Sequence, residues 1–471
     1  MSKSSRIVLM HPRLDHLVQA ATPDYIDENR GTTPPMGLLY LQAALENSNH
    51  ESLLLDANVE NLDYKQAAKK ALEFQPDLIG LQAMSFTLPD AYLQAKAIKE
   101  LAPEMPIIIG GPHPTIYPIE TVELPAVDFA FAGEGEFGLI KFMDVLTQPE
   151  QWQNIPGLAY MEKGEARFNP SSGYIEKMDD IPLPARSSTP WQKYGSVLSE
   201  RDSMTIMITS RGCPFNCIFC NRMGRRYRYH SAEYVLREID EINKLGIKEI
   251  FIHDDTFTLN KSRIKEICEG LIERNYDIVW EARTRVDCVD REMLALMRKA
   301  GCTRMSFGVE SGSPHVLEKM NKGIELKRVE QVFQWCREVG ITTLADFMIG
   351  NYGEKMEDIK KSQKLVKKIN PDYAQFSICS PYPETPLYKL AIEKGIVKSD
   401  VWKEFAKDPM STFRSPVWTE YFTAEELVKI VAQCYRAFYW RPSFILKQLK
   451  KINSFEQFYL MARSAIGMIR K

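Results

Sequence analysis

The sequence lacks any apolar run of about 18 residues, so we expect no membrane-spanning helix. Its formal net charge is only −2, so it lacks the basic excess that bulk binding to nucleic acid requires. The apolar run near the amino terminus is too short for a secretory signal, and nine cysteines are an odd number for a disulfide framework. We therefore expect a protein of the reducing cytoplasm rather than a disulfide-bonded one.

Three of the cysteines nevertheless stand close together. Cys213, Cys217 and Cys220 form a C-x3-C-x2-C pattern in a loop after a β-rich run, 205–209. Soft thiolate ligands suit iron–sulfur chemistry, and three ligands leave one iron of a four-iron cluster open. Zinc is the alternative, but the neighbourhood lacks a second C-x2-C pair and has His230 as its only close histidine.

The first 146 residues alternate short apolar runs with helical patterns, which predicts a doubly wound parallel sheet. Strands are expected at 6–10, 52–55, 78–84, 106–109 and 127–132. Ligands bind such a sheet outside the carboxyl ends of its strands. The residues expected at that edge are Asp56, Ser85, Gly110, Gly111, Gly133 and Glu134. No G-x-G-x-x-G follows the first strand, and the glycines alternatively only form turns.

A proline-rich stretch, 147–201, then predicts a linker with a small hairpin near 157–168. From 202 to about 395 a second β/α series predicts a partial six-unit barrel, with strands at 204–209, 248–253, 278–282, 303–308, 342–349 and 373–379. Charged or special residues follow every strand at the same end. They are the cysteine loop, Asp254 with Asp255, Arg283, Glu310 with Ser311, Gly350 with Glu354, and Ser380.

The remainder, 396–471, reads as a helical region. Residues 436–471 hold eight Lys or Arg against one acidic residue, interleaved with aromatics. Such a segment lies on a membrane surface or shapes a substrate pocket, or else it closes one end of the barrel.

Several motifs together resemble one family. SRGCPFNCIFC is the most specific, with the aromatic Phe219 before the last cysteine; others are IIIGGPHPT, FAGEGE, IHDDTFT, MSFGVESGS and FMIGNYGE. Across nearly its whole length the chain resembles the cobalamin-binding radical S-adenosylmethionine (SAM) enzymes. This group includes the anaerobic magnesium-protoporphyrin ester cyclase and the class B methyltransferases.

The resemblance implies three cofactors. Cys213, Cys217 and Cys220 would hold a [4Fe–4S] cluster whose open iron chelates SAM, from which one electron releases a 5′-deoxyadenosyl radical. It also implies contacts from this chain to SAM. Asp254 and Asp255 would meet the methionine amino group, Arg283 its carboxylate, and Glu310 and Ser311 the ribose. The run 347–350, ending at Gly350, would pass the adenine. A structural ion pair between Glu310 and Arg283 is the alternative.

The first domain resembles a cobalamin module that departs from the D-x-H-x-x-G pattern. The nearest match, beginning at Asp56, has Asn58 in place of the histidine. The resemblance therefore implies cobalamin without a histidine beneath cobalt, and His113 as a positioning group.

The leading hypothesis is radical methylation of an unactivated carbon through methylcobalamin. Cyclisation, oxidation or carbon–carbon coupling of a lipid or tetrapyrrole is a second, and a cobalamin- or redox-sensing protein with a structural cluster is a third. We expect an electron donor such as flavodoxin or ferredoxin, and peripheral membrane contact through the carboxyl-terminal region. The sequence assigns no catalytic side chain and does not name the substrate.

Overall fold

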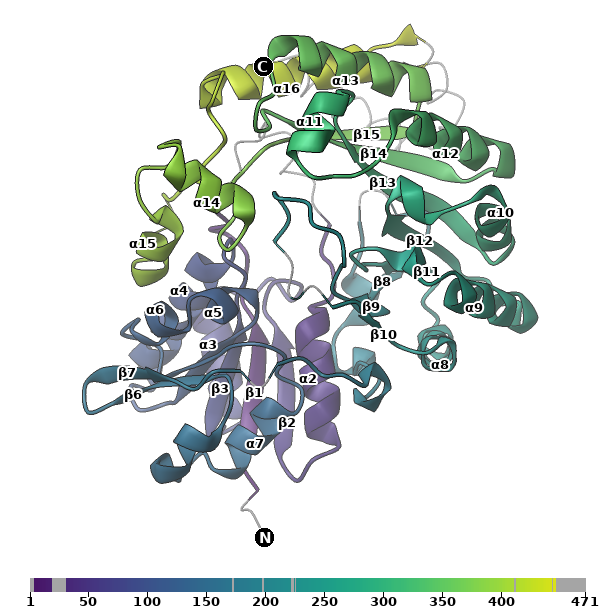
Figure 1. The fold of residues 1–471 in the computed structure, drawn as a ribbon. Helices are drawn as coiled ribbons and strands as arrows, with labels where there is room; N and C mark the ends of the chain where they lie inside the picture. The colour runs from purple at the N-terminus through teal and green to yellow at the C-terminus, as the bar shows by residue number, and fades with distance from the viewer. Residues whose placement is uncertain are drawn as a thin grey trace.

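The structure is a computed structural model of the chain. It describes residues 4–18, 31–171, 173–196, 199–221, 224, 226–410, 412–442 and 444–445. Two β-sheets organise these residues, and Figure 1 shows the amino-terminal sheet on one side of the molecule and the second sheet, with its outer helices, on the other.

The amino-terminal sheet has seven strands within the described residues, in the order β2-β1-β3-β4-β5-β6-β7. The first five are parallel: β1 (Arg6–His11), β2 (Glu51–Asp56), β3 (Leu78–Gln82), β4 (Ile107–Gly110) and β5 (Phe129–Phe131). The order reverses direction between β1 and β3, which is the topological switch point where such sheets bind ligands.

Helices cover both faces of this sheet because the side chains of each strand alternate between them. Val8 and Met10 of β1 face α3 (Tyr64–Glu73) and α4 (Leu88–Leu101). Ile7 and Leu9 face α2 (Met36–Glu46) and α7 (Gly138–Asp144). The short helices α5 (Pro112–Ile116) and α6 (Pro118–Val122) follow β4. The expected doubly wound sheet is confirmed.

The stretch expected to be a linker is more closely integrated than the sequence indicated. Its hairpin, β6 (Leu158–Glu162) and β7 (Glu165–Phe168), pairs antiparallel with β5 and extends the first sheet. Further along, the buried Arg186 donates to the carbonyl oxygen of Ile206 at 2.7 Å and to Glu238 at 2.5 Å. The stretch therefore packs against both sheets, and the predicted domain boundaries at 146 and 201 stay a prediction.

The second sheet has six parallel strands in the described chain, adjacent in sequence order. They are β8 (Met204–Met207), β11 (Glu249–Ile252), β12 (Val279–Thr284), β13 (Cys302–Glu310), β14 (Thr342–Ile349) and β15 (Tyr373–Ile378). β8 and β15 lie at opposite edges and do not pair, so the six β/α units form the expected partial barrel.

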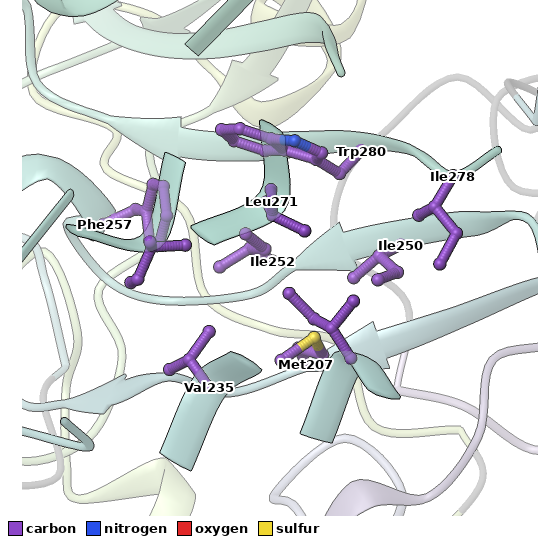
Figure 2. A pocket seen from close by; sticks show the side chains of 10 residues that line it. Met207, Val235, Ile250, Ile252, Phe257, Leu271, Ile278 and Trp280 are labelled. Atoms are coloured by element: carbon purple, nitrogen blue, oxygen red, sulfur yellow. The ribbon is translucent and has the colours of Figure 1, made fainter. Parts of the chain in front are cut away.

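Helices on the outer face of this sheet bury the principal core. They are α8 (Ala232–Lys244), α9 (Lys261–Arg274), α10 (Arg291–Lys299), α11 (Pro314–Lys319), α12 (Leu326–Val339) and α13 (Met356–Ile369) (Figure 1). Side-chain caps fix several starts; for example, Asn260 accepts from the backbone N–H of Arg263 at the start of α9. Figure 2 shows a small hollow in this core, lined only by apolar side chains such as Met207, Phe257 and Trp280. It offers no polar partner to a ligand and belongs to the core.

The carboxyl-terminal helices join the two halves and close the barrel edge. α14 (Pro386–Glu393) and α15 (Val401–Lys407) share an apolar core with the first domain. α16 (Ala424–Tyr439) packs on β15. The first residues of the basic, aromatic segment therefore close one end of the barrel, which was one of the expected alternatives. Residues 446–471 lie outside the described residues, so membrane contact by that segment stays a prediction. Within the described chain, no helix is long and apolar enough to cross a membrane.

Candidate functional site between the two sheets

The three cysteines lie in a loop that opens from β8. Just before them, β9 (Ser210–Arg211) pairs antiparallel with β10 (Arg228–Tyr229), which closes the base of the loop. Gly212 is required there, because its φ is +82° and a Cβ would lie 2.3 Å from the carbonyl oxygen of Arg226. The loop therefore begins at a turn that only glycine accommodates.

Backbone contacts hold the loop between two helix ends. The N–H of Ile218 donates to the carbonyl oxygen of Met320 at 3.0 Å, and the N–H of Leu387 donates to the carbonyl oxygen of Ile218 at 2.9 Å. The side chain of Asn321 donates to the carbonyl oxygen of Asn216 at 2.9 Å. These contacts fix the loop against the carboxyl end of α11 and the start of α14.

The thiols have neighbours that suit ligand thiolates. Nη1 of Arg285 lies 3.7 Å from Sγ of the buried Cys217, so a positive charge stands beside this sulfur. Sγ of Cys213 lies 3.6 Å from Oγ1 of Thr256. All nine cysteines lie in the described part of the chain, and none forms a disulfide. Phe219 belongs to this loop, and the Lys322 ammonium lies 5.8 Å from its ring centre.

Two adjacent carboxylates after β11 have different surroundings. Asp254 is buried and accepts four hydrogen bonds, from the N–H and hydroxyl groups of Thr209 and Ser210, at 2.6 to 3.0 Å. Burial raises the pKa of Asp254, although the charge of Arg263 opposes the shift. Asp255 is exposed and lines a cavity. Asp254 thus fixes the base of the cluster loop, while Asp255 lines the cavity beside it.

That cavity has a volume of about 160 Å³ and lies between the first domain and the cluster loop. Its lining residues are Glu134, Ile208, Ser210, Arg211, Gly212, His253 and Asp255. Sequence reasoning missed His253 and Arg211. His253 packs edge-on against Phe251 at 4.2 Å, and burial together with the charge of Arg283 lowers the pKa of His253 to about 4. Its position one residue before the Asp254–Asp255 pair was the available signal.

The inner face of the barrel carries charges. Ala282 and Thr284 are buried on the helix side of β12, so Arg283 points to the inner face, where its guanidinium lies 5.4 Å from the ring of Phe251. Asp346 has the same orientation between buried Ala345 and Phe347. Burial raises the pKa of Asp346 to about 7, against the opposing charge of Arg283. Asp346 was missed because it lies inside a strand rather than after one.

At the end of β13 the two residues predicted to bind the ribose, Glu310 and Ser311, have different surroundings. Glu310, with φ of +65°, forms an ion pair with Lys322 at 2.8 Å rather than the expected alternative pair with Arg283. Gly308 leaves room for that pair, since a Cβ there would lie 2.5 Å from Oε1 of Glu310. The hydroxyl of Ser311 is buried and lies 3.3 Å from that of Ser362 on α13. Ser311 therefore packs on the helix layer.

The run after β14 has mainly structural contacts. Phe347 is buried in the outer core and stacks on Phe376. The N–H of Gly350 donates to Glu354 at 2.7 Å, and burial raises the pKa of Glu354 to about 7. A Cβ at Gly350 would lie 2.6 Å from Leu427 of α16, so this glycine permits the close packing of that helix.

The carboxyl edge of the first sheet combines turn residues with open positions. Asp56 accepts from the hydroxyl of Tyr194 at 2.8 Å and from the turn N–H groups of Asn58 and Val59, so it holds a turn. Gly111 and Gly133 have positive φ and also form turns. At Gly110, by contrast, a Cβ would meet no described atom within 4 Å, which leaves open space at the sheet edge.

Ser85 and His113 meet at this edge, with Oγ and Nδ1 3.2 Å apart. His113 is fully buried, and burial lowers its pKa to about 3. Its Nε2 is buried without a hydrogen-bond partner among the described residues. Met84, two residues after the end of β3 at the switch point, keeps 42% of its surface exposed. An unpartnered ring nitrogen, open space and an exposed methionine thus lie at the same sheet edge.

Glu134 connects this edge to the cluster loop. Its Oε1 accepts from Arg211 at 3.0 Å and from Arg228 at 2.9 Å, and its Oε2 accepts from the N–H of Ile175 at 2.6 Å. Burial alone would raise the pKa of Glu134, but the Arg228 hydrogen bond and the Arg211 charge hold it below its usual range. The carboxyl ends of both sheets therefore meet at one cavity.

Comparisons with known proteins agree with this arrangement. Residues 24–140 match the model of the B12 binding domain, and residues 207–366 match that of the radical SAM superfamily. A protein of Pyrococcus horikoshii, named an uncharacterised methyltransferase, is 34% identical over 461 residues, covering 96% of this chain and 97% of its own. The chain belongs to the cobalamin-binding radical SAM enzymes.

More distant family members carry different names. The anaerobic magnesium-protoporphyrin IX monomethyl ester cyclase of Rubrivivax gelatinosus is 28% identical over 430 residues, which are 89% of this chain and 76% of the cyclase. The structure of OxsB with aqua-cobalamin and SAM bound has a TM-score of 0.75 at 18% identity, covering 99% of this chain and 72% of OxsB. This likeness shows a shared fold.

Family membership confirms several expectations. The protein is a cobalamin-dependent radical SAM enzyme of the methyltransferase group, and its cofactors are a [4Fe–4S] cluster, SAM and cobalamin. Membership in this enzyme family favours catalysis over the sensor alternative. The roles of individual site residues stay predictions.

The residues present fit these groups. Three thiols on one loop, held by backbone contacts at Ile218, are a donor set for an iron–sulfur cluster. Among the described residues, no three His, Cys, Asp or Glu side chains, these thiols included, already converge on one point, so the type and spacing of the donors favour the cluster over zinc. The unpartnered Nε2 of His113 and the open space at Gly110 suit a large polar cofactor at the switch point.

Proposed function

We propose that the protein methylates an unactivated carbon of its substrate. The observation that carries the proposal is the meeting of the two carboxyl edges at one cavity, through Glu134 and Arg211. When bound, the cluster with SAM supplies one-electron cleavage and hydrogen abstraction, and cobalamin supplies a methyl carrier. Relatives named methyltransferases support this choice, among them the hopanoid C-3 methylase of Methylococcus capsulatus, 26% identical over 360 residues.

In this proposal the chain orients groups and excludes water. Cys213, Cys217 and Cys220 hold the cluster, and the exposed carboxylate of Asp255 receives the methionine amino group. Arg283 suits the methionine carboxylate, because a planar guanidinium forms paired hydrogen bonds with a carboxylate. Glu310, held by Lys322, is the candidate for the ribose. Asp254 contributes indirectly, by fixing Thr209 and Ser210.

The test follows methyl-labelled SAM in the anaerobically reconstituted holoenzyme. We expect label to reach cobalamin and deoxyadenosine to accumulate once the cluster is reduced. Formation of deoxyadenosine while cobalamin never acquires label would overturn methyl transfer. A Cys220→Ala variant should form no deoxyadenosine, whereas Cys268→Ala, which removes a thiol buried in the core, should still form it.

The match to magnesium-protoporphyrin cyclases favours a second candidate, a radical cyclisation or oxidation. Incubation with magnesium-protoporphyrin IX monomethyl ester separates the two. Conversion of this tetrapyrrole without incorporation of label would favour cyclisation, and its recovery unchanged would disfavour it. Both candidates need a reductant, for which we propose a flavodoxin or ferredoxin.

We also propose that the protein contacts a membrane surface peripherally, through residues 446–471. Because α16 is part of the barrel, the suitable comparison is the full chain against a chain ending at Ile445. Equal behaviour of the two in liposome flotation would remove the argument for a lipid surface.

A further inference from the structure

Four charged side chains form a network across the two halves of the molecule. Arg211 and Arg228 come from the hairpin at the base of the cluster loop, and Glu134 and Glu136 from the loop after β5. Arg211 binds Glu134 at 3.0 Å and Glu136 at 2.5 Å, and Arg228 binds Glu134 at 2.9 Å. Two positive and two negative groups balance each other.

The network is largely buried. Exposure of the four side chains is 18% for Arg211, 14% for Glu134, 7% for Glu136 and 3% for Arg228. A guanidinium fork can bind two carboxylates at once, which an ammonium group does less well. Removing one partner would leave a buried charge unpaired, so the network resists being opened.

Its position joins the two cofactor edges. Arg211 stands two residues before Cys213, and Glu134 follows the turn at Gly133, where β5 ends. The same guanidinium lies 5.4 Å from the ring of Tyr40 on α2, whose hydroxyl donates to the carbonyl oxygen of Ile208 at 3.2 Å. The start of the cluster loop is thus attached to the first domain at two points. The motifs FAGEGE and SRGC, far apart in sequence, make this contact with each other.

We infer that Arg211 is a positioning residue that fixes the cluster loop to the cobalamin-binding domain and thereby sets the separation of the two cofactor sites. The packed connection between Glu136 and Ser210 and the helices α14 and α15 also join the two halves. Those contacts set the general arrangement, whereas Arg211 ties the residues that lead directly into Cys213 to the loop after β5. The inference depends on the family's cofactors and does not depend on the proposed methyl transfer.

The decisive measurement is the distance between the reduced cluster and cob(II)alamin, from their magnetic dipolar coupling in the holoenzyme. We expect a narrow distribution in the wild type and a broader or shifted one in Arg211→Lys, which keeps the charge and loses the fork. The matched control is Arg226→Lys, in an exposed ion pair with Glu176 near the same hairpin, which should leave the distribution unchanged. An unchanged distribution in Arg211→Lys overturns the inference.

Hydrogen–deuterium exchange gives an independent readout on the whole chain. In Arg211→Lys we expect amide exchange to rise roughly tenfold or more in both 132–138 and 212–221, because both segments lose the same contact. A rise in only one segment, or a uniform rise across the protein, would show ordinary destabilisation and overturn a positioning role. The milder Glu136→Gln, which keeps the Glu134 pairs, serves if Arg211→Lys does not hold its cofactors. Glu136→Gln should raise amide exchange in the same two segments, by a smaller factor. If exchange does not rise in both segments, the inference is wrong. Neither measurement requires methyl transfer to occur.

Discussion

Ser210 lies three residues before the first cysteine of the cluster loop, and its hydroxyl donates to Oδ2 of Asp254 at 2.6 Å. The neighbouring Thr209 hydroxyl donates to the same oxygen, also at 2.6 Å. A carboxylate at the end of one strand therefore shapes the loop that follows another.

We expect Asp254→Asn to weaken the cluster loop. An amide cannot accept all four hydrogen bonds, so a buried donor is left unpaired at a cost of about 1–3 kcal/mol. Iron content after reconstitution and the free energy of unfolding should both fall. Asp255→Asn is the matched control, expected to keep its iron and lose affinity for SAM. If Asp254→Asn kept full iron content but lost SAM binding, Asp254 would be a direct ligand.

Gly212→Ala should prevent the loop from forming. The new Cβ would meet the Arg226 carbonyl oxygen at 2.3 Å on a residue with φ of +82°. Gly164 has a similar φ of +84°, but no described atom lies within 4 Å of a Cβ there. Gly164→Ala should therefore cost only the backbone strain, about 1–3 kcal/mol, and keep the cluster. Equal cluster contents in the two variants would show that the clash is relieved.

Asp346 gives a pH-dependent prediction for stability. Its folded-state pKa, about 7, is raised above the ordinary 3.8, so its contribution is present at low pH and is lost as pH rises from about 4 through 7. Asp346→Asn removes this loss, so the variant should gain stability over the wild type between pH 5 and pH 8. This gain should grow by about 3 kcal/mol from pH 5 to pH 8, because each pKa unit corresponds to about 1.4 kcal/mol, and denaturant unfolding of the apoprotein measures it. A pH-independent difference would contradict the raised pKa. Glu354, whose pKa is also about 7, remains in both proteins and cancels in the comparison.

Cys217→Ala should abolish the cluster absorbance and leave cobalamin binding intact, since the thiol and the first sheet contribute to different sites. Visible spectra of the reconstituted protein report both cofactors. Loss of both signals together would contradict this prediction. It would indicate that the cluster loop also supports the cobalamin-binding edge, through the contact between Arg211 and Glu134.

The strands and the cluster loop could be predicted from sequence because apolar runs and cysteine spacing are local signals. The exact end of β8 could not. Thr209 was expected in the strand, yet its N–H donates to Asp254 of the next strand end and the strand stops at Met207. That partner lies 45 residues away, beyond the reach of any local pattern.

Charged residues at strand ends were located correctly, but their partners could not be read. The pattern predicts a cofactor contact for Glu134, which stays a prediction. The same pattern could not reveal its arginine partner 77 residues away, because a carboxylate after a strand looks alike in sequence in both cases. Asp346 was missed for the opposite reason. Asp346 occupies an inward position within the strand TTLADFMI and is the one charged residue of that strand. Its apolar neighbours identify the strand but give no sign that this position faces the interior of the barrel.

The tyrosines at the end of α16 have a consequence for association between molecules. The hydroxyl of Tyr439 pairs with both the N–H and the carbonyl oxygen of Ala374, and that of Tyr435 accepts from the N–H of Phe376. β15 is an edge strand, and unpaired edge groups are a template for strand addition by another molecule. These two phenols occupy the template, so a chain ending before Thr423 should polymerise through β15, which light scattering would detect.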